Sequence, residues 1–493
     1  MTPPRTVIDK IWDDHVVVEL IAGHGGPGRR SALLHIDRIF LHERTGPALL
    51  QGLAATRRSP AHPEKVFGTM DHIVDTSPLR REGSASVSAQ SFISAFRSST
   101  RAAGVQLFDM DDARQGIVHV VAPEQGIALP GMTLVCPDSH TGTVGGLGAL
   151  AWGIGSTEGE HAVATQTLVL PAAPQMRVRL DGLLPEACSA KDIALALIAR
   201  FGARGGVACG RAAALEFCGP AVRVLGVEGR MTLCNMAVEF GAWTSLVAPD
   251  EATLQWVAGR SFAPRGAMFE TAAAHWRTLV SDDDAAWDAV LTMDVSTLAP
   301  QVSWGTSPEH SGPVTLRLPD PAAEADSSRR AAWQRALQYM GLQPGAALQG
   351  TPIDAAFIGS CTNARLPDLR EAARLLRGRR VAPGVRAMVV PGSMRVRAAA
   401  EAEGLHRVFE DAGFEWRMSG CSLCFFSGGD SFGSRADGSP LRVISSTNRN
   451  FEGRQGPGVR THLASPLTVA ASALAGCIAD PRQWAPTQIT VQA

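Results

Sequence analysis

The chain has 493 residues, a length that favours about three domains over a single hydrophobic core. Its 46 basic and 47 acidic side chains nearly cancel, so no overall field attracts it to nucleic acid or to a membrane surface. Apolar residues make up 45% of the chain, enough for buried cores, but no apolar run reaches the ~18 residues that cross a bilayer. We therefore expect a soluble globular protein with no membrane and no nucleic-acid partner.

The cysteines indicate the compartment. Nine of them are spread along the whole chain, unlike the dense, even-numbered sets of secreted disulfide scaffolds. The N-terminus contains no apolar core of signal-peptide type. We therefore expect a cytoplasmic protein whose thiols stay reduced.

From residue 10 to about residue 200, short strands alternate with helices. Periodicity predicts a helix at residues 86–103 and strands at residues 16–20, 31–36, 116–123 and 132–136. Asp138, Ser139 and His140 follow the last of these strands. In open α/β sheets ligands bind beyond the carboxyl ends of the strands, so this position favours a ligand site.

A glycine-rich stretch follows at residues 143–155, and residues 146–151 match the G-x-G-x-x-A form of a dinucleotide-binding loop. The match does not follow directly on a strand, and no acidic residue ends a second strand where it would hold a ribose. We therefore predict a tightly packed glycine loop and helix here rather than a nucleotide site.

A second α/β unit is expected at residues 201–319. It contains Asn235 and Glu239, which lie on one face if the stretch is helical. Periodicity alone favours an internal structural contact for this pair over a catalytic one. Residues 318–328, rich in proline, alanine and acidic residues, form the best candidate linker.

A third α/β unit follows at residues 320–493. Strands are predicted at residues 354–359 and 387–392, and the first leads directly into Cys361. The whole pattern predicts an α/β fold of three domains, at residues 1–200, 201–319 and 320–493.

Cys421 and Cys424 form a C-x-x-C pair, a spacing at which two sulfurs can bind one metal centre. Cys361 offers a third thiolate, and several arginines follow the pair. Three thiolates beside arginines suggest an iron–sulfur cluster with one iron open to an anionic substrate. A redox pair, or a zinc site completed by His406 or His462, fits the spacing equally well.

Short motifs run along the whole chain, at residues 10–13 (KIWD), 69–72 (TMDH), 123–126 (PEQG), 138–141 (DSHT), 234–237 (CNMA), 303–306 (SWGT), 359–363 (GSCTN), 420–424 (GCSLC) and 446–456 (STNRNFEGRQG). In this order they resemble the aconitase superfamily, most closely the large subunits of its 3-isopropylmalate dehydratase (isopropylmalate isomerase) branch. Their number and order favour the cluster over zinc and over a redox pair.

The resemblance implies three α/β domains of the aconitase type around a cleft that holds one 4Fe-4S cluster. Cys361, Cys421 and Cys424 would be its three cysteine ligands, and one iron would stay open to bind the hydroxyl group and a carboxylate of the substrate. The implied activity is that of a hydro-lyase, which interconverts 2-isopropylmalate and 3-isopropylmalate by dehydration and rehydration in leucine biosynthesis.

The resemblance also implies the catalytic residues around the departing hydroxyl group. These would be Asp71 paired with His72, Asp138 paired with His140, and Glu239 beside the open iron. A carboxylate next to an imidazole fixes its tautomer and favours its protonated form, as proton donation requires.

Further polar residues would bind the substrate or support the cluster. Arg449 and Arg454 would hold substrate carboxylates, since a guanidinium group donates two parallel hydrogen bonds. The other residues with implied binding or supporting roles are His42 and Ser139 for the substrate, and Asn235, Asn363 and Asn448 for the cluster.

In full-length aconitases a fourth, swivelling domain carries the serine that removes the carbon-bound proton. This chain ends at Ala493 without it, so the resemblance implies a separate small subunit and a heterodimer. Residues 425–440 are longer than, and different from, the stretch expected in isopropylmalate dehydratases. That departure leaves homocitrate, 2-methylmalate (citraconate) or dimethylmalate open as substrates, and RNA binding by a cluster-free relative is a more distant alternative.

Overall fold

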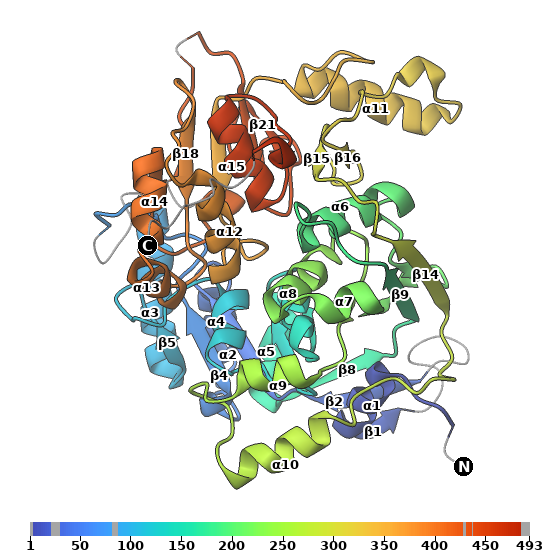
Figure 1. Cartoon of the computed structure of the whole chain (residues 1–493). Coiled ribbons are helices and arrows are strands. Elements are labelled where there is room, and N and C mark those ends of the chain that lie inside the picture. Colours follow the sequence, from blue (N-terminus) through green and yellow to red (C-terminus); the bar gives the residue numbers. More distant parts are fainter. Residues whose placement is uncertain (1–2, 21–29, 81–86, 427–429, 436, 485–493) are drawn as a thin grey trace, which may run out of the picture. The chain divides into compact units, whose positions relative to one another are not determined.

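The computed structural model describes residues 3–20, 30–80, 87–426, 430–435 and 437–484 (Figure 1). The chain divides into two compact units. Unit 1 comprises Met1–Ile73, Val87–Leu183 and Ala203–Ser296, and unit 2 comprises Val74–Ser86, Leu184–Gly202 and Thr297–Ala493. Both contain parallel sheets connected by helices, which confirms the predicted α/β class. The three-domain division with boundaries after residues 200 and 319 stays a prediction.

The first sheet of unit 1 has five parallel strands in the order β5-β4-β3-β6-β7. They are β3 (Arg38–His42), β4 (Val66–Thr69), β5 (Gln106–Phe108), β6 (Thr133–Cys136) and β7 (Leu150–Gly153). Helix α2 (Gly46–Ala55) packs against α3 (Val87–Ala103) and α5 (Ser156–Thr165). All five strands therefore end at the same edge of this sheet.

Three further sheets occur among the described residues of unit 1, the smallest being the antiparallel pair β10 (Val207–Ala208) and β11 (Arg211–Ala212). A parallel sheet has the order β13-β12-β9-β14, formed by Thr244–Leu246, Ala214–Cys218, Gln175–Asp181 and Ala289–Asp294. An antiparallel sheet joins β1 (Val16–Leu20), β2 (Ser31–His35) and β8 (Thr167–Pro171). The helices of this part are α1 (Val7–His15), α7 (Pro220–Val224), α8 (Val227–Met236), α9 (Glu251–Val257) and α10 (Ala267–Trp276).

The strands predicted at residues 16–20, 31–36 and 132–136 are confirmed as β1, β2 and β6. The helix predicted at residues 86–103 is confirmed as α3, with Ser86 outside the described residues. The strand predicted at residues 116–123 is wrong, because this stretch forms helix α4 (Val118–Glu124). Its β-branched residues favour a strand, but the carboxylate of Asp71 accepts the N–H of Val118 at 3.0 Å and caps the helix.

The glycine-rich stretch forms a short 3-10 helix, η2 (Thr141–Leu147), which leads into β7. Ala151, the alanine of the G-x-G-x-x-A match, lies in that strand, whereas a dinucleotide loop would open a helix there. η2 packs closely on α8, and a Cβ atom on Gly146 would lie 2.5 Å from the backbone nitrogen of Met231. The structure thus confirms a tightly packed glycine segment and gives no support to a nucleotide site.

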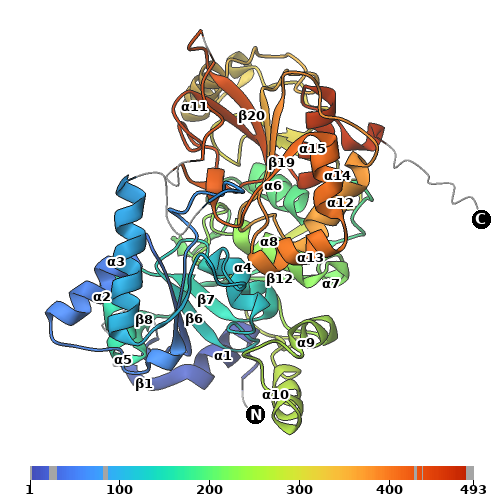
Figure 2. The same ribbon diagram turned by 90° about the vertical axis from the view of Figure 1, so that its left-hand side faces the viewer.

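Unit 2 contains a five-stranded parallel sheet in the order β19-β18-β17-β20-β21. Its strands are β17 (Ala355–Ile358), β18 (Arg386–Val389), β19 (Phe414–Trp416), β20 (Leu441–Ser445) and β21 (Val459–Leu463). The strands predicted at residues 354–359 and 387–392 are thereby confirmed. Helices α12 (Leu366–Leu376), α14 (Leu405–Ala412) and α15 (Pro466–Ala475) lie together beside the sheet (Figure 2).

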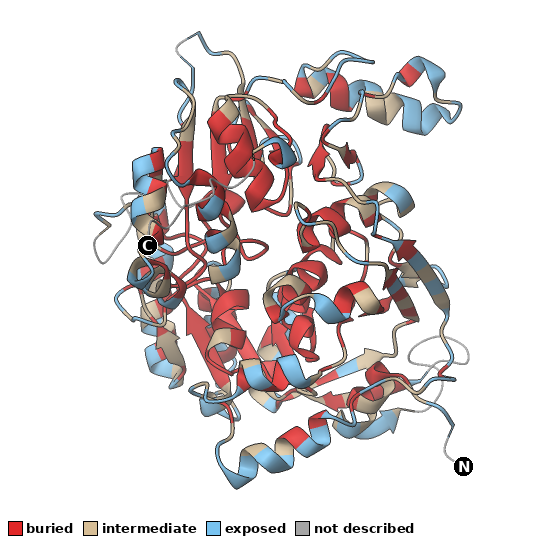
Figure 3. Ribbon diagram, viewed as in Figure 1, coloured by how far each residue is buried: buried red, intermediate tan, exposed pale blue. Residues whose placement is uncertain are grey.

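Burial separates the core of unit 2 from its periphery. The strands of the five-stranded sheet are mostly buried, whereas helix α11 (Ser327–Met340) is largely exposed (Figure 3). The stretch predicted as a linker forms only one 3-10 turn, Pro321–Ala323, before α11 begins. The unit also includes α6 (Ala190–Phe201), α13 (Met394–Ala402) and the pair β15 (Gln301–Ser303) and β16 (Ser311–Pro313). No helix in the described parts of the chain has the length and apolar character for a bilayer crossing.

Candidate active site

In unit 1, polar side chains gather where three neighbouring parallel strands end. His42 is the last residue of β3, Asp71 and His72 follow β4, and Asp138 follows β6. The strand order β4-β3-β6 places these ends side by side, at the carboxyl edge where α/β sheets bind ligands. The predicted ligand position after β6 therefore belongs to a larger group.

His72 lies between two carboxylates. Its Nδ1 is 2.6 Å from Asp71 Oδ1, and its Nε2 is 3.1 Å from Asp138 Oδ2. Burial alone would raise the pKa of Asp71, but the charge and hydrogen bond of His72 outweigh it and hold the pKa below its ordinary value. Asp71 therefore stays ionised and keeps a proton on His72 Nδ1.

Asp138 has a second imidazole partner, His119 of helix α4. His119 Nε2 lies 2.8 Å from Asp138 Oδ1, and its Nδ1 is buried without a hydrogen-bond partner. Burial would raise the pKa of Asp138, but His119 and then His72 hold it well below its ordinary value. No local sequence pattern connects a histidine in an apolar run to a carboxylate 19 residues later, so the sequence analysis missed His119.

Asp138 also contacts His140, its predicted partner. Asp138 Oδ1 accepts the backbone N–H of His140 at 2.7 Å, and the imidazole Nδ1 lies 3.8 Å away, an ion-pair distance. The other ring nitrogen of His140 contacts Glu239, with 3.1 Å between His140 Nε2 and Glu239 Oε1. The structure therefore brings together two linked pairs, His119–Asp138 and His140–Glu239.

His42 and Glu43 also belong to this group of polar side chains, and they contact His72 and the backbone of Asp71. The ring of His42 stacks on that of His72 with 4.1 Å between centroids, and burial lowers the pKa of His42 to about 4. Glu43, which the sequence analysis missed, accepts the backbone N–H of Asp71 at 3.0 Å and that of Ile73. Burial, and then the charge of Asp71, raise the pKa of Glu43 to about 7.

These four side chains are close enough to hold an ion. Among the described residues, His42, Glu43, Asp71 and His72 are the one group of such ligands whose atoms all lie within 4.8 Å of one another. However, both oxygens of each carboxylate already accept hydrogen bonds, from the N–H groups of Asp71, Ile73 and Val118 and from His72. The arrangement is therefore a proton-sharing network.

Asn235 and Glu239 do not share one helical face. Asn235 lies in α8, which ends at Met236, and Glu239 follows in the next turn. Asn235 Nδ2 donates to Thr143 Oγ1 at 2.8 Å, which joins α8 to η2. Glu239, the other member of the predicted pair, contacts His140.

The predicted substrate residue Ser139 also lies beside this histidine, with 3.4 Å between Ser139 Oγ and His140 Nδ1.

In unit 2 the three predicted cysteine ligands follow strands of one sheet. Cys361 comes after β17, and the short turn η4 (Ser422–Cys424), which follows β19, begins directly after Cys421 and ends at Cys424. Asn448 comes after β20, the neighbour of β17. All three cysteines are 5–6% exposed, and none forms a disulfide.

Two side chains connect the sulfurs. Ser360 Oγ donates to Cys424 Sγ at 3.2 Å, and the amide of Asn448 lies 3.6 Å from both Cys361 Sγ and Cys424 Sγ. Asn448 is supported by Lys191 of α6, which is completely buried and donates its Nζ to the carbonyls of Ser446 at 3.1 Å and Thr447 at 2.5 Å. Ser360 and Asn448 therefore connect the sulfurs of Cys361 and Cys424 in buried, polar surroundings.

The backbone beside the cysteines is strained. Ser360 has φ 87° and Ser422 has φ 48°, the left-handed region that residues with a Cβ atom rarely adopt. Such strain persists only where surrounding contacts enforce it, and it is concentrated at functional sites.

The predicted arginines and Asn363 differ in their contacts. Arg454 Nη2 lies 4.0 Å from Cys424 Sγ, and its guanidinium stacks on the rings of Phe425 and Phe451. Arg454 Nε is buried without a hydrogen-bond partner, and Arg449 is half-buried. Asn363 Nδ2 donates to Asp368 at 3.0 Å, in the first turn of α12, while its Oδ1 is buried without a partner.

Comparison with known proteins decides the family. Residues 9–476 match the aconitase family (aconitate hydratase). The chain belongs to the aconitase family. It is 50% identical over 482 residues to the 3-isopropylmalate dehydratase large subunit 1 of Bradyrhizobium diazoefficiens, covering 98% of this chain and 97% of that protein. The crystal structure of Thermococcus kodakaraensis aconitase X in its holo form is more distant, with 13% identity, a TM-score of 0.44, and coverage of 85% of this chain and 84% of that one.

Members of the aconitase family generally carry a 4Fe-4S cluster, and the residues present fit one. Three thiols of unit 2 are buried, the amide of Asn448 bridges those of Cys361 and Cys424, and Arg454 Nη2 lies 4.0 Å from Cys424 Sγ. A zinc ion would hold its sulfurs at about 2.3 Å and so within about 4 Å of one another. Among the described residues, the one group with ligand atoms close enough to share a single ion is the His42, Glu43, Asp71 and His72 group, which contains no cysteine. Both ring nitrogens of His462 already form hydrogen bonds, one with the carbonyl of Ser303 and the other with Arg442. The geometry therefore disfavours the zinc alternative.

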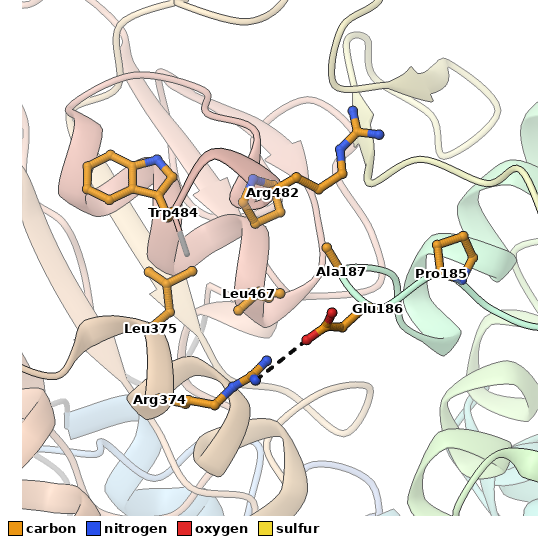
Figure 4. Close-up of a pocket in the computed structure, with 9 residues that line it drawn as sticks. Pro185, Glu186, Ala187, Arg374, Leu375, Leu467, Arg482 and Trp484 are labelled. Atoms are coloured by element: carbon orange, nitrogen blue, oxygen red, sulfur yellow. Dashed lines mark ion pairs between the residues drawn. The ribbon is translucent and has the colours of Figure 1, made fainter. Parts of the chain in front are cut away.

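The structure of this aconitase-family chain also contains a pocket of about 330 Å³ in unit 2 (Figure 4). Apolar side chains such as Leu375 and Trp484 line it, with Glu186 and Arg374 forming an ion pair of 3.9 Å at its side. None of its lining residues is a predicted site residue, so the pocket does not alter the site described above.

Proposed function

We propose that the chain is the large subunit of a 3-isopropylmalate dehydratase, a hydro-lyase that isomerises 2-isopropylmalate and 3-isopropylmalate by dehydration and rehydration. The main support for this proposal is the 50% identity, over 98% of the chain, to a protein named 3-isopropylmalate dehydratase large subunit 1. Two features support it: the histidine–carboxylate network around His72 contains groups suited to acid–base chemistry, and the buried thiols of Cys361, Cys421 and Cys424 are of the kind that bind an iron–sulfur cluster.

We assign the cluster ligands to Cys361, Cys421 and Cys424. Their burial, and the amide of Asn448 at 3.6 Å from two of the sulfurs, support this set. When bound, a 4Fe-4S cluster with one iron not held by cysteine supplies a Lewis acid for the hydroxyl and carboxylate groups of a hydroxy diacid. Asn235, which donates to Thr143, and Asn363, which donates to Asp368, are proposed to support the cluster site.

The residues of unit 1 would handle the protons. Dehydration expels hydroxide, a poor leaving group, so a proton must reach the oxygen as the carbon–oxygen bond breaks. Asp71 holds the Nδ1 proton of His72, which leaves Nε2 as the atom that exchanges a proton with Asp138. His140 Nε2, beside Glu239, is the second candidate donor.

Four polar side chains are proposed to bind the substrate. Arg454 suits a carboxylate, since its Nε is buried without a partner and a guanidinium can donate two parallel hydrogen bonds. Arg449 is proposed for a second carboxylate, and His42 and Ser139 for contacts beside His72 and His140. Because the relative is named a large subunit, we also propose a separate small subunit that carries the swivelling domain and the serine base.

The decisive experiment combines the anaerobically reconstituted chain with candidate small subunits and follows the isomerisation of 2-isopropylmalate. We expect turnover that disappears in Cys361→Ser and persists in Cys477→Ser, a half-buried cysteine outside the proposed ligand set. Turnover of citraconate, homocitrate or dimethylmalate without isopropylmalate would contradict the substrate. Absence of iron from the reconstituted chain would contradict the cofactor.

A further inference from the structure

The stretch after Cys424 contains a buried carboxylate. Asp430 is 4% exposed and lies among the described residues that follow Cys424. Its Oδ1 accepts a hydrogen bond from Arg417 Nη2 at 2.6 Å, and its Oδ2 accepts one from Thr76 Oγ1 at 2.6 Å. Ser422 Oγ also donates to Oδ2, at 2.7 Å. Asp430 thus fixes three separate segments of unit 2.

The contact to Ser422 bears on the proposed cluster site. Ser422 stands between Cys421 and Cys424, and its φ of 48° is unfavourable for a residue with a Cβ atom. Asp430 contacts this turn through the hydrogen bond from the Ser422 hydroxyl group. A strained turn of this kind needs an outside contact to keep it in place, and Asp430 provides it.

Charge makes the contact specific. A buried carboxylate is stable only when ionic and hydrogen-bonding partners surround it, and Asp430 has Arg417, Thr76 and Ser422. Arg417 is anchored as well, by Glu415 at 3.1 Å, and Thr76 is held through its carbonyl by the N–H of Met418 at 2.8 Å. Asp430 is therefore part of a buried network of hydrogen bonds and ion pairs, not of a single surface contact.

We infer that Asp430 is a positioning residue that holds the turn between Cys421 and Cys424 in the geometry that binds the iron–sulfur cluster. The inference rests on the ligand set of the proposed function. It predicts that Asp430 helps to retain the cofactor.

Two variants test the inference on the complete chain. Asp430→Asn removes the charge while keeping the shape, and Ser422→Ala removes only the hydroxyl group that Asp430 holds. Asp480→Asn is the matched control, because Asp480 is 3% exposed and binds Arg482 at 2.6 Å, yet contacts no proposed ligand. The readouts are iron and sulfide per chain, the EPR spectrum, and the rate at which a ferrous-iron chelator removes the cluster.

We expect Asp430→Asn and Ser422→Ala each to accelerate cluster loss by about tenfold or more, and the double variant to be no faster than the quicker single one. Asp480→Asn should stay within about twofold of the wild type. Wild-type rates in both test variants would overturn the inference while leaving the proposed function intact. A wild-type chain that takes up no iron would overturn both, and if Asp430→Asn does not fold, Ser422→Ala still decides.

Discussion

The pH dependence of stability should report on Glu43. Its pKa is raised from 4.5 to about 7 by burial and by Asp71, so the folded chain binds a proton that the unfolded chain releases between these values. Stability is therefore unaffected by Glu43 below pH 4.5, falls as the pH rises from there, and levels off above about pH 7. At ~1.36 kcal/mol per pKa unit, the loss between about pH 5 and pH 8 is on the order of 2.5 kcal/mol.

Glu43→Gln removes this titration. Its amide group can accept only one of the two backbone N–H groups that Glu43 accepts, so the variant should be less stable than the wild type by roughly 1–3 kcal/mol at pH 5. At pH 8 this deficit should shrink by about 2.5 kcal/mol, because the wild type then carries the buried charge.

The assay is urea unfolding followed by tryptophan fluorescence, with the variant and the wild type compared at each pH so that other titrations cancel. Asp480→Asn is the control, since Arg482 outweighs burial and holds the pKa of Asp480 below its ordinary value. Its difference from the wild type should stay constant from pH 5 to pH 8. If the difference in unfolding free energy between Glu43→Gln and the wild type does not change with pH, Glu43 does not titrate between pH 5 and pH 8 and the reasoning is wrong.

Four further predictions follow from the site. Cys361→Ser should lose the cluster iron while keeping its far-UV circular dichroism, and a variant that keeps its iron would contradict the ligand set. His119→Ala should lower kcat by about a hundredfold or more, since it removes a hydrogen-bond partner of Asp138. An unchanged kcat would show that His119 has only a structural role. Arg454→Lys should raise KM more than it lowers kcat, because lysine cannot bind a carboxylate with two parallel bonds. Gly146→Ala should lower stability by about 1–3 kcal/mol in thermal unfolding, because its Cβ would lie 2.5 Å from Met231 N.

The sequence predicts the parts of the site that depend on chain order. Asp138 and Cys361 each follow an apolar strand, and parallel strands bring such positions to one edge of a sheet. The class of fold follows for the same reason, since strands and helices alternate along the chain. These features need only local patterns and the spacing between them.

The parts that the sequence did not predict depend on long-range contacts. His119 lies in a valine-rich run that favours a strand, but the run forms helix α4, whose first N–H is accepted by the carboxylate of Asp71, 47 positions earlier. Asp430 is separated from Thr76 by 354 positions, which no local pattern connects. Glu43 was missed because its partners are backbone N–H groups, which leave no trace in side-chain composition.

The buried Lys191 has a consequence for the order in which the chain is made. Its carbonyl partners on Ser446 and Thr447 lie 255 and 256 positions later, so they leave the ribosome long after the lysine does. At ~5–20 residues per second that delay is on the order of 10 to 50 s. Unit 1 is complete once Ser296 has emerged, whereas α6 must wait for the C-terminal part of unit 2. During synthesis the α6 segment is thus an unfinished piece of unit 2, and a nascent-chain experiment should find it protease-sensitive until residue 447 is exposed.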